Sequence, residues 1–337
     1  MKVLKFYLIA VMVFFGFSLA KAEETLNGAG ATFPYPLYSS WAYQYNKETG
    51  VKLNYQSIGS GGGVRQITSR TVDFGASDDA LKLEEIEKNK LLQWPQVIGG
   101  IVLVVNIPGI KSEQLVLDSN TVCKIFLGDI KKWNDSRIKA LNKSLNLPDN
   151  DITIVYRSDG SGTTAVFTHY LAETCKEFKE KVGEGKSVNW PVGIGGKGNE
   201  GVANYVKRTP YSIGYVEFAY AKQNNLAYTL LVNASGNIVK PDLKSFSEAA
   251  KYGDYNPEKH FYTWVTNVKS KGAWPITAAT HILVAREKVD VNKKVVKFFD
   301  WAFSKKGDKL AEDLIYAPLP DSLKNKVREY WRKNGIY

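Results

Sequence analysis

Apolar and polar residues follow two alternating patterns along this chain, one typical of strands and one typical of helices. Apolar side chains alternate with polar ones over residues 51–55, and residues 97–106 form a continuous apolar run, as in a buried strand. Residues 163–174, 291–303 and 322–331 instead have helical patterns. Further short strands are predicted at residues 152–156, 213–216 and 279–285. This alternation of strands and helices predicts an α/β fold.

The first 22 residues have the pattern of a cleaved export signal. A short basic start precedes an apolar run over residues 6–19, and the small residues that end at Ala22 suit signal peptidase. The run is too short for a comfortable membrane span, and no cysteine follows it to carry a lipid anchor. We therefore expect residues 1–22 to be removed as a signal peptide and the mature chain to be secreted.

The mature chain is long enough for one large domain or for two of medium size. It contains no internal repeat and no low-complexity linker. Two lobes would therefore have to join through ordered segments. The best candidates for these connections are residues 98–105 and 275–282.

The charge of the chain is basic but evenly spread. Its 45 Lys and Arg against 34 Asp and Glu give a net charge of +11. No segment gathers five or more basic residues, because acids separate the lysines within the helical stretches. Nucleic acid binding favours a concentrated basic patch, so no nucleic acid partner is predicted. Diffuse charge can help to attract a small anion over a distance.

Two cysteines, Cys123 and Cys175, fall in a chain that we expect to reach an oxidising compartment. They can form a disulfide or remain two thiols, and the sequence leaves both open. Neither they nor the three histidines have the spacing of metal ligands. The run G-x-G-x-x-G at residues 193–198 does not link a strand to a helix in a dinucleotide-binding unit. No metal and no other cofactor is therefore predicted.

Three glycine-rich turns, each followed by a helical pattern, form the strongest chemical signal in the chain. They occupy residues 28–34, 59–63 and 157–163. Each carries a serine or threonine, and the third begins with Arg157. A helix N-terminus presents unpaired N–H groups and a partial positive charge, which together bind anions. Any one such turn can be a plain helix cap, and the spacing alone does not show that the three meet in space.

Asp78 lies in a fourth short motif, at residues 74–79. One interpretation of this aspartate is a further helix cap. The other is a hydrogen-bond acceptor inside an anion site. An ionised carboxylate accepts hydrogen bonds and cannot donate them, so it suits only an anion that carries a proton. Phosphate keeps at least one proton near neutral pH, whereas sulfate has none.

Several motifs follow one another in a specific order along the chain. They are GAGATFP (28–34), GSGGGV (59–64), VDFGASD (72–78), DGSGT (159–163), WPVGIGGKGN (190–199), IGYVEFAY (213–220) and AWPIT (273–277). Together they closely resemble the periplasmic phosphate-binding protein of the bacterial phosphate-specific ABC importer, over essentially the whole mature chain. The resemblance implies an α/β fold of the two-lobed periplasmic binding protein class (type II-like), with a hinge of crossing strands and a ligand cleft between the lobes. The expected lobes are residues 23–98 with 278–337 (lobe I) and residues 99–277 (lobe II).

The resemblance also implies which residues hold phosphate. The matching positions are Thr32, Phe33, Ser60, Asp78, Arg157, Ser161, Gly162 and Thr163. Asp159 matches an acid that pairs with the arginine and holds its fork in place. The chain departs from the family pattern at Asp79, where relatives commonly have a small residue. A second acid there either raises the pKa of Asp78 or points outward.

The implied function is capture of inorganic phosphate in the periplasm and its delivery, after hinge closure, to the membrane permease subunits of an ABC importer. The implied protein is a monomer that is not an enzyme and needs no cofactor. Two alternatives remain, a receptor for another oxyanion such as sulfate or molybdate, and a phosphatase. The phosphatase alternative has less support. No metal site is evident in the sequence, and the sequence shows no base for Ser60 or Ser161.

Overall fold

The structure is a computed structural model that describes residues 24–337, so the signal predicted at residues 1–22 lies outside it. The strands are β1 (Thr25–Gly30), β2 (Lys52–Ser57), β3 (Phe74–Ser77), β4 (Leu91–Asn106), β5 (Val116–Leu117), β6 (Thr153–Arg157), β7 (Ile194–Gly196), β8 (Ser212–Glu217), β9 (Ala227–Tyr228), β10 (Leu230–Val232), β11 (Ile238–Val239) and β12 (Thr277–Ala285). The α-helices are α1 (Tyr35–Thr49), α2 (Ser60–Thr68), α3 (Leu83–Asn89), α4 (Ser119–Phe126), α5 (Ser136–Leu141), α6 (Gly162–Thr174), α7 (Lys176–Lys181), α8 (Gly198–Arg208), α9 (Phe218–Gln223), α10 (Leu243–Ala250), α11 (Val289–Ala302), α12 (Lys305–Asp313) and α13 (Asp321–Lys333), with one 3-10 turn, η1 (Pro257–Lys259). Within residues 24–337, no helix has both the length and the apolar character needed to cross a membrane.

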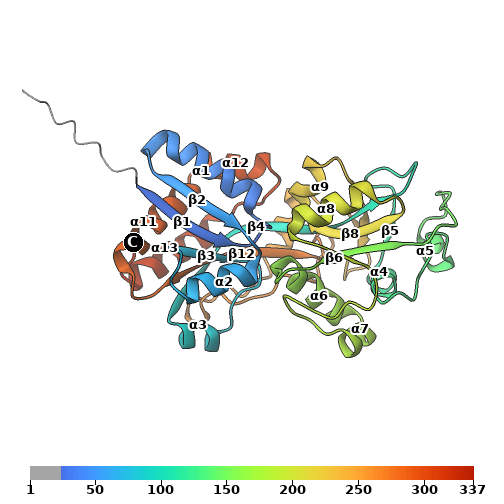
Figure 1. Ribbon diagram of the computed structural model, residues 1–337, viewed down its shortest axis with the longest axis horizontal. Helices are drawn as coiled ribbons and strands as arrows, with labels where there is room; N and C mark the ends of the chain where they lie inside the picture. Colours follow the sequence, from blue (N-terminus) through green and yellow to red (C-terminus); the bar gives the residue numbers. More distant parts are fainter. Residues whose placement is uncertain (1–23) are drawn as a thin grey trace, which may run out of the picture.

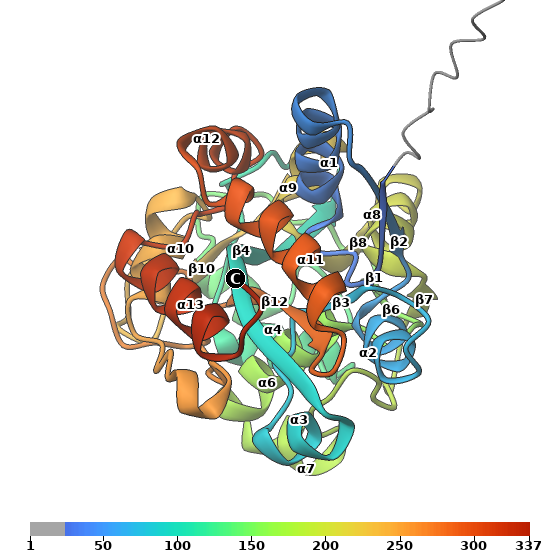
Figure 2. The same ribbon diagram turned by 90° about the vertical axis from the view of Figure 1, so that its left-hand side faces the viewer.

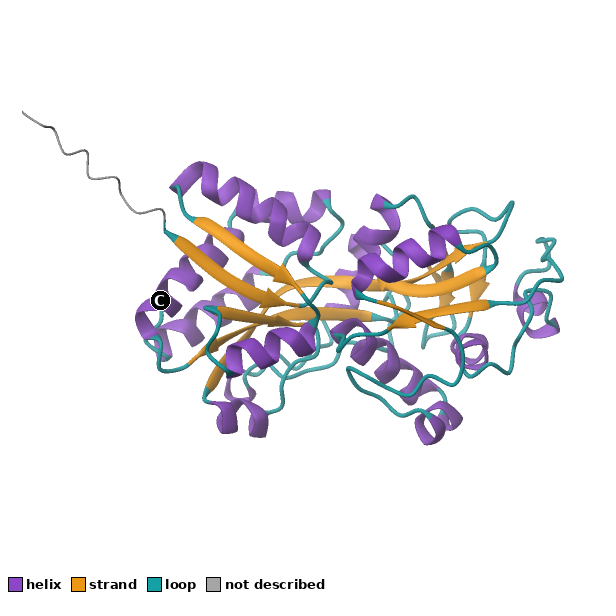
Figure 3. Cartoon of the chain, in the orientation of Figure 1, coloured by secondary structure: helices purple, strands orange, loops and turns teal. Residues whose placement is uncertain are grey.

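A mixed sheet runs along the length of the molecule and joins its two halves (Figure 3). The strand order is β2-β1-β3-β12-β4-β8-β6-β7, with β9 also paired to β4. β4 belongs to both halves, because Leu91–Gly100 pair with β12 and Ile101–Asn106 pair with β8. The halves are therefore connected by a continuous strand rather than by a flexible linker.

Helices cover the sheet in both halves (Figure 1). One half carries α1, α2, α3 and α11 to α13, and the other carries α4 to α9. The view onto the end of the first half shows α11 and α13 there (Figure 2). The apolar face of α1 packs on α11, with Tyr38 against Phe299 and Tyr45 against Phe298 at ring-centroid distances of 5.8 and 5.1 Å. The helical spacing of α1's apolar residues thus gives it one buried face.

The strand directions bring the glycine-rich turns toward one another. β1 is parallel to β2 and β3, and β3 and β4 are both antiparallel to β12. β6 is parallel to β8, which is antiparallel to β4. It follows that β1 to β3 and β6 run in opposite directions from the two ends of the molecule, and their carboxyl ends face each other at the middle. In open α/β sheets, ligands bind just outside the carboxyl ends of strands.

A disulfide joins Cys123 in α4 to Cys175 at the end of α6. Of the two alternatives left by the sequence, the paired form is therefore the one present. The bond links two helices of the second half, far along α6 from its N-terminal turn.

Candidate functional site

A buried arginine whose orientation is fixed by an aspartate lies at the junction of the halves. Arg157 ends β6, and its side chain is 1% exposed. Its Nε and Nη2 donate to the two carboxylate oxygens of Asp159 at 2.8 and 2.7 Å, and the Gly198 amide donates to the same carboxylate at 3.0 Å. Burial raises the pKa of Asp159, but the Arg157 fork outweighs burial and leaves that pKa below its usual value. Nη1 of Arg157 has no hydrogen-bond partner within residues 24–337, which indicates a place for an acceptor.

A buried carboxylate, that of Asp78, lies directly after β3 at the same junction. Its Oδ1 accepts from the Thr280 hydroxyl at 2.7 Å, and its Oδ2 accepts from the Ser60 hydroxyl at 3.4 Å. Burial raises the pKa of Asp78 to about 7, against the opposing effects of the Thr280 hydrogen bond and the Arg157 charge. A Cβ built on Gly162 would lie 2.8 Å from Oδ2 of Asp78 and 2.3 Å from the Ser60 oxygen. Only glycine lets the N-terminus of α6 approach this closely.

The second and third glycine-rich turns meet across the junction. The Gly61 amide donates to the Gly160 carbonyl at 2.9 Å. Gly59 has a φ of 86°, which glycine adopts readily, and a Cβ there would lie 2.5 Å from the Asp159 carboxylate. The sequence left open whether these turns converge, and the fold brings them into direct contact.

The N-terminus of α6 offers donors to the same place. Ser161 caps the helix, because its hydroxyl oxygen accepts from the Thr164 amide at 2.9 Å. The first amides of a helix have no partner within the helix, and here the cap uses Thr164 while the amides of Gly162 and Thr163 come before it. Ser161, Gly162 and Thr163 are all buried. These amides, with the positive end of the helix, suit a bound anion.

The first turn places Thr32 beside the second half of the molecule and Phe33 beside Tyr316 of the first half. The Thr32 carbonyl accepts from the Tyr220 hydroxyl at 2.5 Å, and the Phe33 carbonyl accepts from the Tyr316 hydroxyl at 2.6 Å. The Thr32 hydroxyl oxygen accepts from the amide nitrogen Nδ2 of Asn199 at 2.7 Å. These bonds hold the backbone before α1 in one conformation at the junction.

Three residues that the sequence did not single out complete the surroundings. Asn199 bridges Thr32 to the Thr163 hydroxyl, which accepts from its Nδ2 at 3.2 Å. Thr280 reaches Asp78 from β12, and Lys186 donates to the carboxylate of Asp79. Asn199 ends the motif at residues 190–199, but nothing in the sequence near Thr280 or Lys186 signals their partners.

Asp79 is paired with Lys186 rather than turned out to solvent alone. The two side chains are 18% and 24% exposed. The interpretation that the Asp79 side chain points outward is thus incomplete, because a cation accompanies the carboxylate. The negative charge of Asp79 still adds slightly to the raised pKa of Asp78, after burial as the main cause.

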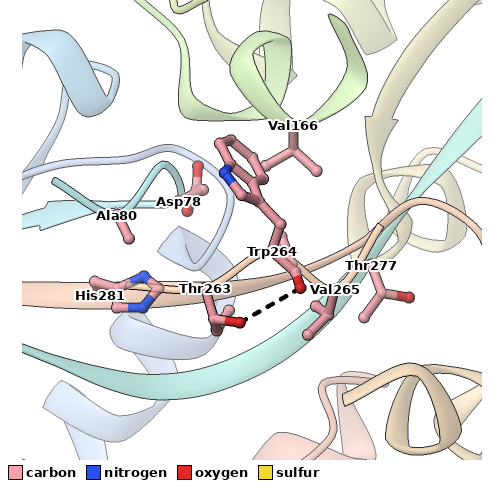
Figure 4. Close-up of a pocket in the computed structure, with 10 residues that line it drawn as sticks. Asp78, Ala80, Val166, Thr263, Trp264, Val265, Thr277 and His281 are labelled. Carbon is pink, nitrogen blue, oxygen red and sulfur yellow. Dashed lines mark hydrogen bonds between the residues drawn. The ribbon is translucent and has the colours of Figure 1, made fainter. Parts of the chain in front are cut away.

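A small cavity lies beside Asp78 and is lined by His281 and Trp264, among others (Figure 4). Neither ring nitrogen of His281 has a hydrogen-bond partner within the described part of the chain. Burial lowers the pKa of His281 to about 4, so this imidazole is neutral at pH 7. His281 therefore adds no positive charge beside Asp78.

These buried groups offer the chemistry that a small tetrahedral anion requires. The hydroxyls and helix amides at the junction can donate hydrogen bonds, Arg157 supplies a cation, and Asp78 supplies an acceptor. Residues 24–337 contain no cluster of three or more His, Cys, Asp or Glu side chains that could hold a metal ion. The structure brings the predicted residues of both halves to one junction, and their contact with phosphate stays a prediction.

Comparison with known families and solved structures identifies the class of protein. Residues 18–306 match the family model described as the PBP superfamily domain. The fold is similar to that of a phosphate binding protein from Stenotrophomonas maltophilia, with a TM-score of 0.68 and 18% identity over 90% of this chain and 93% of that one. It is also similar to a high affinity periplasmic phosphate-binding protein (PfluDING) bound with phosphate, with a TM-score of 0.71 and 20% identity over 90% and 93% of the two chains. The predicted periplasmic binding protein fold is confirmed.

Sequence relatives narrow the class to a family. The chain is 50% identical to the phosphate-binding protein PstS of Pasteurella multocida, over 96% of this chain and 95% of that protein. It is also 50% identical to the phosphate-binding protein PstS of Haemophilus influenzae, over 92% and 93% of the two chains. The chain belongs to the PstS family of phosphate-binding proteins, as the order of its motifs predicted.

Proposed function

We propose that this chain is a periplasmic substrate-binding protein that captures inorganic phosphate and delivers it to an ABC importer. The observation that carries the proposal is the pairing of a buried, oriented Arg157, with one nitrogen unpartnered, and a buried Asp78 at one junction. Relatives of this similarity are named as phosphate-binding proteins, which is a substrate-binding role rather than catalysis. The diffuse positive charge of the chain suits attraction of an anion.

Phosphate fits this pair better than sulfate for a chemical reason. Ionised Asp78 accepts a hydrogen bond from the protonated oxygen of phosphate, whereas sulfate would place an unprotonated oxygen against the carboxylate. A buried polar group left without a partner costs about 1–3 kcal/mol, and more if it is charged. The unpartnered Nη1 of Arg157 can donate strong charge-assisted hydrogen bonds to phosphate.

The binding residues that we propose come from both halves. They are Thr32, Phe33, Ser60, Asp78, Arg157, Ser161, Gly162 and Thr163, with Asp159 in support of Arg157. The proposed lobes are residues 23–98 with 278–337, and residues 99–277. The exchange of pairing partners along β4, between Gly100 and Ile101, lies two residues from the proposed boundary and supports it.

Phosphate binding would favour the closed arrangement of the lobes, because ligand contacts from both sides stabilise it. The permease subunits of the importer would then recognise the closed form. We propose that the protein acts as a monomer in the periplasm after removal of residues 1–22. No nucleic acid and no cofactor takes part.

Freshly purified protein tests this function. A tight receptor should carry about one phosphate per chain, released on unfolding and measured by a colorimetric phosphate assay and by native mass spectrometry. The variant Arg157→Ala should carry none, because it lacks the cation of the site. The control Arg137→Ala removes an arginine that is 41% exposed and should retain phosphate. Wild-type protein that neither carries phosphate nor binds it after stripping would overturn the proposal.

A further inference from the structure

Asn199 makes four hydrogen bonds at the junction, and both halves of the molecule take part in them. It lies in the first turn of α8 and is fully buried. Its backbone N–H donates to the Thr32 hydroxyl oxygen at 3.1 Å, and its Nδ2 donates to the same oxygen at 2.7 Å. Nδ2 also donates to the Thr163 hydroxyl oxygen at 3.2 Å, and Oδ1 accepts from the Glu217 amide at 2.8 Å.

The Glu217 amide fixes which way the Asn199 side chain is turned. A backbone N–H can only donate, so the atom facing it must be the amide oxygen. The amide nitrogen of Asn199 is thereby directed at the two threonine hydroxyls. Its two hydrogens match the two oxygens that it contacts, so both are used.

The hydrogen bonds from Asn199 restrict what the Thr32 hydroxyl can do. A hydroxyl has two acceptor lone pairs and one donor hydrogen. Both lone pairs of Thr32 are filled from Asn199, one by the backbone N–H and one by Nδ2. The Thr32 hydroxyl can therefore act toward a ligand only as a donor. One lone pair of Thr163 is filled in the same way.

We propose that Asn199 is a positioning residue that sets the Thr32 hydroxyl as a donor to the bound anion. This inference rests on the proposed function. Asn199 and Thr163 belong to the second half of the molecule, whereas Thr32 belongs to the first. The bonds to Thr32 can form only when the halves are together, so the donor set is completed by closure. Because Thr32 cannot accept, it does not compete with the Asp78 carboxylate for a hydrogen bond from the proton of phosphate.

A double-mutant cycle tests the proposal in stripped protein titrated with inorganic phosphate. Asn199→Ala and Thr32→Val should each weaken binding by about 10-fold, as expected when one well-aligned hydrogen bond is lost. The phosphate affinity of the double variant should be about equal to that of the single variant with the lower affinity, because Asn199 acts through the Thr32 hydroxyl. The control Asn204→Ala, an exposed asparagine on the same helix, should bind phosphate as the wild type does.

A second variant separates hydroxyl orientation from packing. Asn199→Leu fills a similar volume without a donor or a charge. It should bind phosphate as weakly as Asn199→Ala, whereas a packing role predicts that the larger side chain restores binding. Losses that simply add in the double variant, or wild-type affinity in either Asn199→Ala or Asn199→Leu, would each overturn the inference. A wild type that fails to bind phosphate would instead overturn the proposed function.

Discussion

Among single residues, Asp78 and Arg157 place a carboxyl group and a guanidinium group, both buried, at one junction, where electrostatic interactions are stronger than in water. Arg157 is held by Asp159 through two short hydrogen bonds, so its free nitrogen points in a fixed direction. Asp78 is held by Thr280 from β12. The anion that fits must satisfy both an N–H donor and a carboxylate acceptor.

Asp78→Asn should admit sulfate. An amide can donate a hydrogen bond through its nitrogen, so the repulsion between a carboxylate and an unprotonated oxygen disappears. Sulfate affinity should rise by at least about 10-fold, the equivalent of a 1.4 kcal/mol penalty removed. Isothermal calorimetry with both anions measures this. Asp254→Asn, which changes the same charge at a side chain 72% exposed, should leave sulfate rejected, and rejection by Asp78→Asn too would refute the role given to Asp78.

The raised pKa of Asp78 predicts a pH dependence of stability in stripped protein. Its pKa is about 7 in the fold against 3.8 for a free carboxyl, with burial as the main cause. The folded state therefore holds the proton more tightly, so this contribution is complete below about pH 4 and is lost as pH rises through about 7. Relative to Asp78→Asn, the wild type should lose about 3 kcal/mol of unfolding free energy between about pH 5 and about pH 8. Urea unfolding at both pH values gives the difference, and equal slopes with pH in the two proteins would contradict it.

Asp78, Arg157 and the glycine-rich turns could be predicted from the sequence because each lies in a short motif of adjacent residues. Asn199, Thr280 and Lys186 could not be assigned in this way. Their partners lie 167, 202 and 107 residues away in the chain, so only the fold brings them together.

Among the elements, the turn after β3 and the segment before β7 meet across the junction through Asp79 and Lys186. The Lys186 carbonyl also accepts from the Ser161 amide at 2.9 Å, so the same segment supports the start of α6. Lys186 offsets an acid that would otherwise lie beside Asp78 and repel an incoming anion. The pair thus accounts for an acid at a position where the family pattern has a small residue.

Lys186→Ala should weaken phosphate binding by about 3- to 10-fold, since it leaves the Asp79 charge unpaired at a partly exposed site. Asp79→Ala should cost less, and the double variant should bind nearly as well as Asp79→Ala. Fluorescence or calorimetric titration with phosphate measures the three affinities. The control Lys176→Ala removes a lysine that is 87% exposed. Full affinity in Lys186→Ala, or losses that add in the double variant, would remove this pair from the binding site.

The disulfide joins two elements, α4 and the end of α6. It closes a loop of 52 residues, which corresponds to about 4 kcal/mol of chain entropy in the unfolded state. Cys123→Ala with Cys175→Ala should lower the unfolding free energy by about this amount in urea. Phosphate affinity should stay unchanged, because the bond lies at the opposite end of α6 from Gly162. A large loss of affinity with unchanged stability would reverse this assignment.

Element boundaries were predictable where apolar patterns are clean and were missed where polar side chains are buried. β4 begins at Leu91 rather than at residue 97, because Gln93 and Gln96 interrupt the apolar run. Both glutamines are buried, and their amides bond to the Leu81 and Phe299 backbones. A hydrophobic pattern cannot predict the burial of a polar side chain whose hydrogen-bond partners lie elsewhere in the fold.

At the scale of the whole molecule, one continuous strand, β4, connects halves whose turns face one another. The α/β alternation could be predicted from periodicity, whereas the two-lobed arrangement came from the resemblance, because no local pattern encodes how the halves are oriented. Bonds across the junction, such as those of Asn199 and Lys186, describe the closed arrangement. Closure around the anion follows from contacts that neither half can complete alone.

A crystal structure of the protein with phosphate bound tests this central claim most directly. We expect one phosphate at the junction, with one oxygen about 2.7–2.9 Å from Nη1 of Arg157 and a protonated oxygen about 2.5–2.7 Å from the Asp78 carboxylate. The Thr32 and Thr163 hydroxyls and the amides of Gly162 and Thr163 should complete its shell. Phosphate bound elsewhere, or held without Arg157 and Asp78, would contradict the site.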